Sequence, residues 1–172
     1  MLNLNYAPGT RSFFTDRETR DIGSGLVLRR EYFQSIRPAV SRMLINVDIS
    51  TGVMYKPGSL LDLCRQFFNK PDPNELAPRR GFTDHERVRL QRFITGIRVF
   101  TRNPGTGVVD RNRTRVVKKL STTGARDLPF LLHDGGQTTV AQYFQNTYNI
   151  PLQYPDVVCA EVRLPGLCDC SG

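Results

Sequence analysis

Residues that alternate between apolar and polar constrain the fold of this 172-residue chain more than any other feature. Met43, Ile45, Val47 and Ile49 recur at every second position, which is the period of a β-strand. The same period, or a short apolar run, predicts further extended segments at 26–36, 53–55, 97–102, 113–120, 128–132 and 157–162. The chain is therefore expected to be rich in β-strands, especially after residue 96.

Helices are expected where a capping box precedes apolar residues at helical spacing. Such boxes lie at 59–62, 83–86 and 139–142. The three helices are expected to end near Asn69, near Thr95 and at Tyr148. Turns are expected at 50–52 (Ser-Thr-Gly) and 134–136 (Asp-Gly-Gly), and the proline-rich stretch at 71–74 is the best candidate for a linker.

Positive charge is concentrated in the segment from residue 79 to residue 119. These 41 residues hold 12 of the 24 Lys and Arg residues and only three acids, so their net charge is +9, while the rest of the chain carries −1. Strict alternation would place Arg113, Arg115, Val117 and Lys119 on one face of a strand. Together with a pI near 9.7, the segment indicates an anionic partner: nucleic acid, an acidic membrane surface or an acidic protein.

Three aromatic residues follow the basic segment and favour single-stranded nucleic acid among these partners. Phe130 can offer a ring to an unstacked base, and Tyr143 and Tyr148 can donate their hydroxyls to phosphate oxygens. Each residue alone also suits a packing role, because Phe130 lies in an apolar run and Tyr143 on an amphipathic helix. The alternative to an anionic partner for the basic segment 79–119 is a face that is simply solvated.

The residues give little support for catalysis, metal binding or membrane insertion. The chain has two His residues, no Gly-x-Ser-x-Gly elbow and no phosphate-binding Gly-x-x-x-x-Gly-Lys loop. Cys168 and Cys170 are one residue apart with no His nearby, which is poor spacing for zinc. We therefore expect a binding module without cofactor or metal. No long apolar run or signal peptide is present, so a location in the cytosol or the nucleus is expected.

Two groups of motifs resemble eukaryotic Argonaute proteins. The segment 33–38 (FQSIRP), followed by 45–50 (INVDIS), resembles their first linker, and 9–14 resembles the end of the N-terminal domain before it. The segments 139–144 (TVAQYF) and 152–155 (LQYP) resemble their PAZ domain. The resemblance implies an α+β fold: a small OB/SH3-like β-barrel with an αβ insertion at about 127–148, preceded by an extended linker with β-strands and a helix.

The resemblance also implies a function and a division of the chain. Residues 1–24 would be the end of the N domain, 25–78 the first linker and 79–172 the PAZ domain, which holds the 3′ end of a guide RNA or the 3′ overhang of a small RNA duplex. The insertion would face the barrel across the binding cleft. The nuclease lobe, which makes some family members RNA-guided endoribonucleases, would belong to the remaining Argonaute domains beyond residue 172. The alternatives are the PAZ segment of a Dicer-like ribonuclease and a scaffold for protein partners.

The resemblance implies a role in RNA binding for seven residues of this chain. Arg113 matches a residue of the family that contacts the terminal phosphate, and Phe130 matches a ring that stacks on the last nucleotide. Tyr143 and Tyr148 match two phosphate-binding tyrosines, and Leu164 matches an apolar wall of the pocket. Asn103 and Arg115 occupy binding positions but depart from the His and Tyr that are common there, and Thr147 replaces a Lys or Arg.

Overall fold

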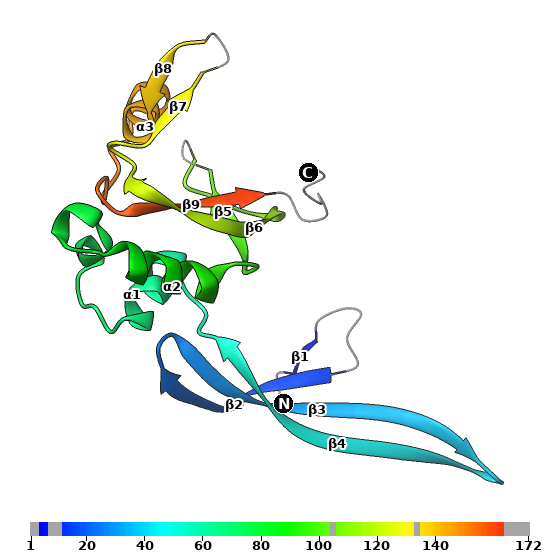
Figure 1. Cartoon of the computed structure of the whole chain (residues 1–172). Helices are drawn as coiled ribbons and strands as arrows, with labels where there is room; N and C mark the ends of the chain where they lie inside the picture. Colours follow the sequence, from blue (N-terminus) through cyan, green and yellow to red (C-terminus); the bar gives the residue numbers. More distant parts are fainter. Residues whose placement is uncertain (1–3, 7–11, 104–105, 133–134, 164–172) are drawn as a thin grey trace, which may run out of the picture. The chain divides into compact units, whose positions relative to one another are not determined.

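The computed structural model describes residues 4–6, 12–103, 106–132 and 135–163, with the side chains of 4–6, 12–17 and 110–113 left undescribed. The chain divides into two compact units, an N-terminal unit (1–69) and a C-terminal unit (70–172). Figure 1 shows their elements in chain order. None of the helices in the described ranges is long and apolar enough to cross a lipid bilayer.

The N-terminal unit is an antiparallel sheet with strand order β1-β2-β3-β4, followed by one helix. The strands are β1 (Leu4–Tyr6), β2 (Ser12–Gly23), β3 (Leu26–Ala39) and β4 (Arg42–Tyr55), and the helix is α1 (Leu60–Phe67). The predicted strands at 26–36 and 43–49 and the helix after Ser59 are confirmed. The side chain of Ser59 accepts a hydrogen bond from the Asp62 amide, as its capping role requires.

The turn predicted at 50–52 is wrong. Strand β4 continues through these residues, because Thr51 pairs with Arg30 and Gly52 with Arg29 in an uninterrupted ladder. The reversal of the chain lies instead between β3 and β4, where Ser41 takes a positive φ of 61°. Backbone hydrogen bonds to a long partner strand outweigh the local preference of a Ser-Thr-Gly triplet for a turn.

The C-terminal unit begins with two short 3-10 helices and then a longer helix. They are η1 (Pro73–Leu76), η2 (Pro78–Arg80) and α2 (Asp84–Ile94). The proline-rich stretch considered as a linker is thus folded, with Asp72 and Glu75 forming a capping box. Both hydrogen bonds of the Thr83–Glu86 box predicted for α2 are present: the Thr83 side chain accepts from the Glu86 amide, and the Glu86 carboxylate accepts from the Thr83 amide. The bond from the Thr83 amide is the main cause that lowers the pKa of Glu86. Leu76, Leu90, Ile94 and Val117 are the largest fully buried side chains in the described part of the chain.

Three strands form the main sheet of this unit, in the order β5-β6-β9. They are β5 (Arg98–Arg102), β6 (Val109–Gly124) and β9 (Val158–Arg163). The α+β class is confirmed, but the closed barrel is not seen among the strands that the structure describes. Strand β6 pairs with β5 on one edge and with β9 on the other, and the described parts of those two outer strands are not paired with each other.

A β-bulge in β6 overturns the predicted face of charges. The register shifts between Val117, which pairs with Val162, and Lys119, which pairs with Glu161. The extra residue moves Lys119 to the opposite side of the sheet from Arg115 and Val117. Val117 is buried, 1% exposed, whereas the Lys119 side chain is 53% exposed and lies 3.3 Å from a Glu161 carboxylate oxygen.

Candidate nucleic-acid interface

A β-hairpin and a helix form an αβ substructure between β6 and β9. Strands β7 (Pro129–Leu131) and β8 (Gln137–Thr139) are antiparallel, and α3 (Val140–Tyr148) follows β8 directly. Figure 1 shows the helix lying against this hairpin. The extent of the substructure agrees with the insertion predicted at 127–148.

Hydrogen bonds fix the N-terminal end of α3 and tie it to the segment 125–128 that precedes β7. The Thr139 hydroxyl accepts a bond from the Gln142 amide, and the Gln142 side chain bonds back to the Thr139 backbone, completing the predicted box. The amide of Val140 donates to the Leu128 carbonyl at 3.1 Å, and the amide of Ala141 donates to the Ala125 carbonyl at 3.0 Å. The helix therefore presents its tyrosines on a fixed frame.

Four rings from β7 and α3 form an aromatic cluster: Phe130, Tyr143, Phe144 and Tyr148. The Phe130 and Tyr143 centroids are 5.0 Å apart at an interplanar angle of 87°, and those of Tyr143 and Tyr148 are 6.0 Å apart at 86°. Phe144 lies 5.5 Å from Tyr148. The Phe130–Tyr143 and Tyr143–Tyr148 contacts are edge-to-face and the Phe144–Tyr148 contact is tilted. Together they hold each ring in a defined orientation. Phe130 remains 36% exposed, so it is not the core residue that an apolar run suggests.

The two tyrosine hydroxyls of the aromatic cluster interact with each other. A hydrogen bond with Tyr143, together with the charge interaction of the same pair, raises the pKa of the Tyr148 hydroxyl above its ordinary value of 10.0. Tyr148 therefore stays protonated at neutral pH and can act as a donor. Two phenolic hydroxyls at one place are suited to the oxygens of a single phosphate.

The predicted residues outside the aromatic cluster belong to the β5–β6 region. Arg115 is half-buried and pairs with Val99 in the sheet. Asn103 is exposed directly after β5, where its carbonyl accepts a bond from the Gly107 amide at 2.8 Å and its amide donates to the Val108 carbonyl at 2.9 Å. Arg113 lies in β6, but its side chain, like all of Leu164, falls outside the described residues. The structure thus brings Phe130, Tyr143 and Tyr148 together and leaves the roles of the other four as predictions.

Residues at the base of the αβ substructure were not identified by their sequence pattern. An ion pair joins Arg79 to Asp127 at 2.8 Å, and another joins Arg126 to Asp156 at 2.9 Å. Gly124 packs so closely against Asp156 that no side chain fits. Phe144 joins the ring cluster. Only Phe144 had a signal in the sequence, its place beside Tyr143 on the same helix; the others depend on contacts between distant segments.

Two family models match the chain one after the other. The Argonaute linker 1 domain matches residues 8–56, and the PAZ domain matches residues 61–166. The linker match favours an Argonaute over the Dicer-like alternative. The domain boundaries predicted at 24/25 and 78/79 stay a prediction.

Rice proteins (Oryza sativa subsp. japonica) are among the similar sequences. Protein argonaute 14 is 33% identical over 165 residues, covering 95% of this chain and 15% of that protein. Protein argonaute 1D is 31% identical over 160 residues, covering 91% of this chain and 14% of that protein. The chain therefore spans about one seventh of the length of these relatives.

Solved structures of the same family were also found. Kluyveromyces polysporus Argonaute with a guide RNA matches with a TM-score of 0.50 at 12% identity, over 95% of this chain and 21% of that one, which is a likeness of fold. The Drosophila Argonaute 2 PAZ domain, in a structure on 3′ end recognition of nucleic acids, is 30% identical over 49% of this chain and 68% of that one, with a TM-score of 0.37. From the two consecutive domain matches, the chain belongs to the Argonaute family and carries its linker 1 and PAZ domains.

Proposed function

We propose that the C-terminal unit binds the 3′ end of a single-stranded guide small RNA, or the 3′ overhang of a small RNA duplex, in RNA-mediated gene silencing. The observation that carries the proposal is the aromatic cluster, in which an exposed ring and two tyrosine hydroxyls are held together on β7 and α3. The PAZ and linker 1 matches provide the context, since both domains belong to Argonautes.

The chemistry of the aromatic cluster suits the last nucleotides of an RNA strand. Phe130 offers a partly exposed ring against which an unstacked base can pack. Tyr143 and Tyr148 donate hydrogen bonds to phosphate oxygens, and such charge-assisted bonds are stronger than neutral ones. Arg113, Arg115 and Asn103 are proposed to add phosphate and sugar contacts, and Leu164 an apolar contact.

The positive charge of the segment 79–119 supports an RNA ligand over an uncharged one. Its net charge of +9 raises the local concentration of a polyanion and speeds its encounter with the protein. Thr147 is exposed on α3 and carries no charge. The chain therefore lacks the Lys or Arg that the family commonly has at this position. Most of the positive charge of the segment lies on strands β5 and β6, which hold seven of its 12 cations and one of its three acids.

The chain itself is proposed to bind RNA without cutting it. Its matched domains are the linker and PAZ domains. Cleavage of a guide-paired target, if the full-length protein performs it, would belong to the remaining Argonaute domains, which are the proposed partners of this chain together with the RNA. The proposed location is the cytosol, with the nucleus as the alternative.

Removing one hydroxyl tests the proposed phosphate site. Tyr148→Phe keeps the ring and its packing but deletes a donor to a charged acceptor, so RNA affinity is expected to fall by about tenfold, from about 1.5 kcal/mol per such bond. Fluorescence titration of a labelled single-stranded RNA measures the change.

For the unmodified chain, log K should fall with log salt at a slope of about −2, as expected for about three neutralised phosphates.

Tyr154→Phe is the matched control, because the Tyr154 hydroxyl accepts a bond from the neighbouring Gln153 and lies outside the aromatic cluster. Its affinity should stay within about twofold of the unmodified chain, well below the effect of a lost charge-assisted bond. If the two variants lose affinity equally, the tyrosine pair is not the phosphate site. A salt slope near zero, or one steeper than about −5, would count against an end site with few phosphates.

A further inference from the structure

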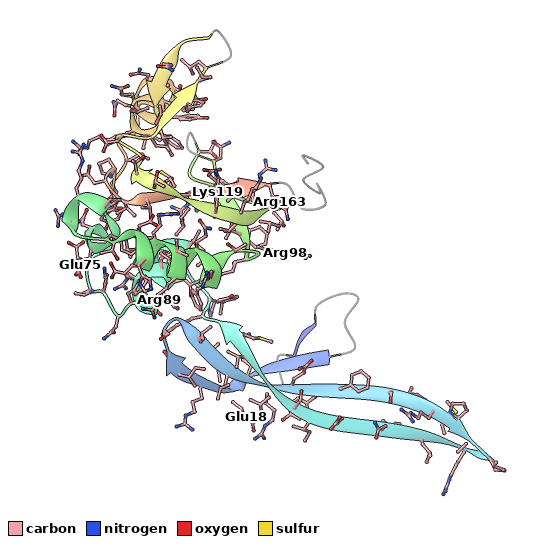
Figure 2. The ribbon with its side chains drawn as sticks, in the orientation of Figure 1. Glu18, Glu75, Arg89, Arg98, Lys119 and Arg163 are labelled. Atoms are coloured by element: carbon pink, nitrogen blue, oxygen red, sulfur yellow. The ribbon has the colours of Figure 1, made fainter. Side chains whose placement is uncertain are left out.

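Strand β6 loses its regular pairing with β9 just before the chain leaves the sheet for the αβ substructure. Leu120 pairs with Ala160 and Gly124 pairs with Val158, so three residues of β6 lie opposite one residue of β9. Lys119, which Figure 2 labels, directly precedes this irregular stretch on β6. Such a stretch disrupts the ladder and bends the strand, here at the point that sets the direction in which the chain leaves the sheet.

The side chain of Ser121 bonds to the backbone on both sides of this stretch. Among the residues that the structure describes, Ser121 is the one polar residue that is buried, with 5% exposed. Its hydroxyl accepts a hydrogen bond from the Cys159 amide at 2.8 Å and donates one to the Thr123 carbonyl at 2.6 Å. One hydroxyl therefore takes the place of a backbone partner for β9 and also closes the irregular part of β6.

The residues after the irregular stretch continue the connection to helix α3. The Ala125 carbonyl accepts a hydrogen bond from the Ala141 amide at 3.0 Å, in the first turn of α3. On the returning segment, the Pro155 carbonyl accepts one from the Arg126 amide at 2.9 Å. Short backbone segments and hydrogen bonds thus connect Ser121 with the helix that carries both tyrosines of the aromatic cluster.

The proposed RNA-binding residues lie on both sides of this connection. Asn103, Arg113 and Arg115 come before it, in the β5–β6 region, and the aromatic cluster comes after it. The αβ substructure joins the sheet through two segments of chain, 121–128 and 154–159. A site built from two groups of side chains needs their separation held to within roughly 0.5 Å. The geometry of the exit from β6 therefore decides whether both groups reach the same nucleotides.

We propose that Ser121 is a positioning residue of the RNA end site, which holds the αβ substructure where its tyrosines and the β5–β6 residues bind the same terminal nucleotides. Ser121 does not touch the RNA and acts through Tyr143 and Tyr148. The inference rests on the proposed function and deepens it, by naming a residue on which the arrangement of the end site depends. The alternative is a hydroxyl that serves stability alone.

Three substitutions separate a positioning role from stability alone. Ser121→Ala removes both hydrogen bonds, whereas Ser121→Thr keeps a hydroxyl on a β-branched residue that suits a strand. Thr95→Val is the control, because the Thr95 hydroxyl lies 2.7 Å from the Gln91 carbonyl and 3.3 Å from the Lys118 carbonyl and so joins α2 to β6. Each variant is melted thermally and titrated with a linear RNA that has a free 3′ hydroxyl and with the same sequence circularised.

Ser121→Ala is expected to lower affinity for the linear RNA by about fivefold and for the circular RNA by less than about twofold, as for the loss of one bond in the end site. Ser121→Thr and Thr95→Val should keep the preference for a free end. An equal loss for both RNAs, a loss that Ser121→Thr does not restore, or the same loss in Thr95→Val would overturn the positioning role. If Ser121→Ala does not fold, Ser121→Cys replaces it, since a thiol keeps the volume but bonds weakly.

A double-mutant cycle tests whether Ser121 acts through the tyrosines. The Tyr148 hydroxyl matters less once the αβ substructure has shifted, so Ser121→Ala/Tyr148→Phe should lose at least about threefold less than the product of the two single losses. Ser121→Ala/Tyr154→Phe should match its product within about twofold, because Tyr154 lies outside the aromatic cluster. Independent losses in both pairs would contradict the proposal.

Amide hydrogen exchange follows the same connection without RNA. In Ser121→Ala the Cys159 amide loses its acceptor and should exchange at least about tenfold faster, and the Ala141 amide at least about threefold faster. Faster exchange at Cys159 with no change at Ala141 would show that the disturbance stops at the sheet, which would overturn the proposal.

Failure of the proposed function would look different. If the unmodified chain binds linear and circular RNA equally and Tyr148→Phe has no effect, the end site is absent and the role of Ser121 falls with it. If the unmodified chain prefers a free end and Tyr148→Phe is effective, but Ser121→Ala keeps that preference, the positioning role alone is removed.

Discussion

Phe130→Ala is expected to weaken RNA binding by about tenfold or more and to leave the salt slope almost unchanged. Stacking of a base on an aromatic ring contributes roughly 1–3 kcal/mol and involves no release of counterions. Phe130 supplies the exposed ring of the aromatic cluster, 5.0 Å from Tyr143, so its removal deletes the stacking surface and loosens the orientation of the tyrosine. Titration at several salt concentrations measures both quantities.

The same substitution has a limited cost in stability. Truncating a fully buried Phe costs about 3–5 kcal/mol, but Phe130 is 36% exposed on a short strand, so the loss should be smaller. Phe130→Leu is the matched variant: it keeps apolar volume without a ring and should lose nearly as much affinity. A folded Phe130→Ala protein with unchanged RNA affinity would contradict the stacking role.

Gly124→Ala is expected to lower the stability of the C-terminal unit by about 1–3 kcal/mol or more, the usual cost of overpacking. A Cβ on Gly124 would lie 2.4 Å from the carbonyl oxygen and 2.5 Å from the carbonyl carbon of Asp156, distances that require the backbone to move. The Gly124 carbonyl also accepts hydrogen bonds from the amides of Asp127 and Leu128, at 3.0 and 2.9 Å. The start of the αβ substructure would therefore shift with it.

Thermal melting measures this effect, with a fall in Tm of about 5–20 °C expected for a domain of this size. Gly52→Ala is the control, because the nearest atom to its added Cβ, a Glu31 carboxylate oxygen, is 4.0 Å away. Its Tm should be unchanged or slightly raised, since alanine restricts the unfolded chain. Equal melting of both variants would show that the contact between Gly124 and Asp156 does not hold the substructure in place.

Local signals in the sequence predicted the helices well, because both residues of a capping box lie within four positions of each other and can be recognised in the sequence. Ser59, Thr83 and Thr139 each accept the expected bond from the backbone three residues later. The helix predicted after the Thr139 box correctly placed Tyr143 and Tyr148 on one helix. Their contact with Phe130 did not, because it depends on how the β7–β8 hairpin packs against α3.

The errors arose where pairing between distant strands decides the structure. The bulge between Val117 and Lys119 leaves no local mark, yet it reverses which side of the sheet Lys119 and Leu120 occupy. The ladder between β3 and β4 likewise removed the turn expected at 50–52. Strict alternation at Met43 and Ile45 predicted a strand, but both side chains are exposed in the N-terminal unit, at 65% and 70%. Alternation identifies a strand and does not identify what covers its apolar side.

The central claim is that this chain recognises an RNA end, and one titration tests it most directly. A pocket that encloses the terminal nucleotide requires a free end, whereas a groove that follows the backbone binds internal stretches equally well. The chain is therefore expected to bind a linear RNA with a free 3′ hydroxyl about tenfold more tightly than the same sequence circularised or carrying a bulky 3′ block, a difference of about 1.4 kcal/mol. Equal affinity for the linear and the circular RNA would contradict the account.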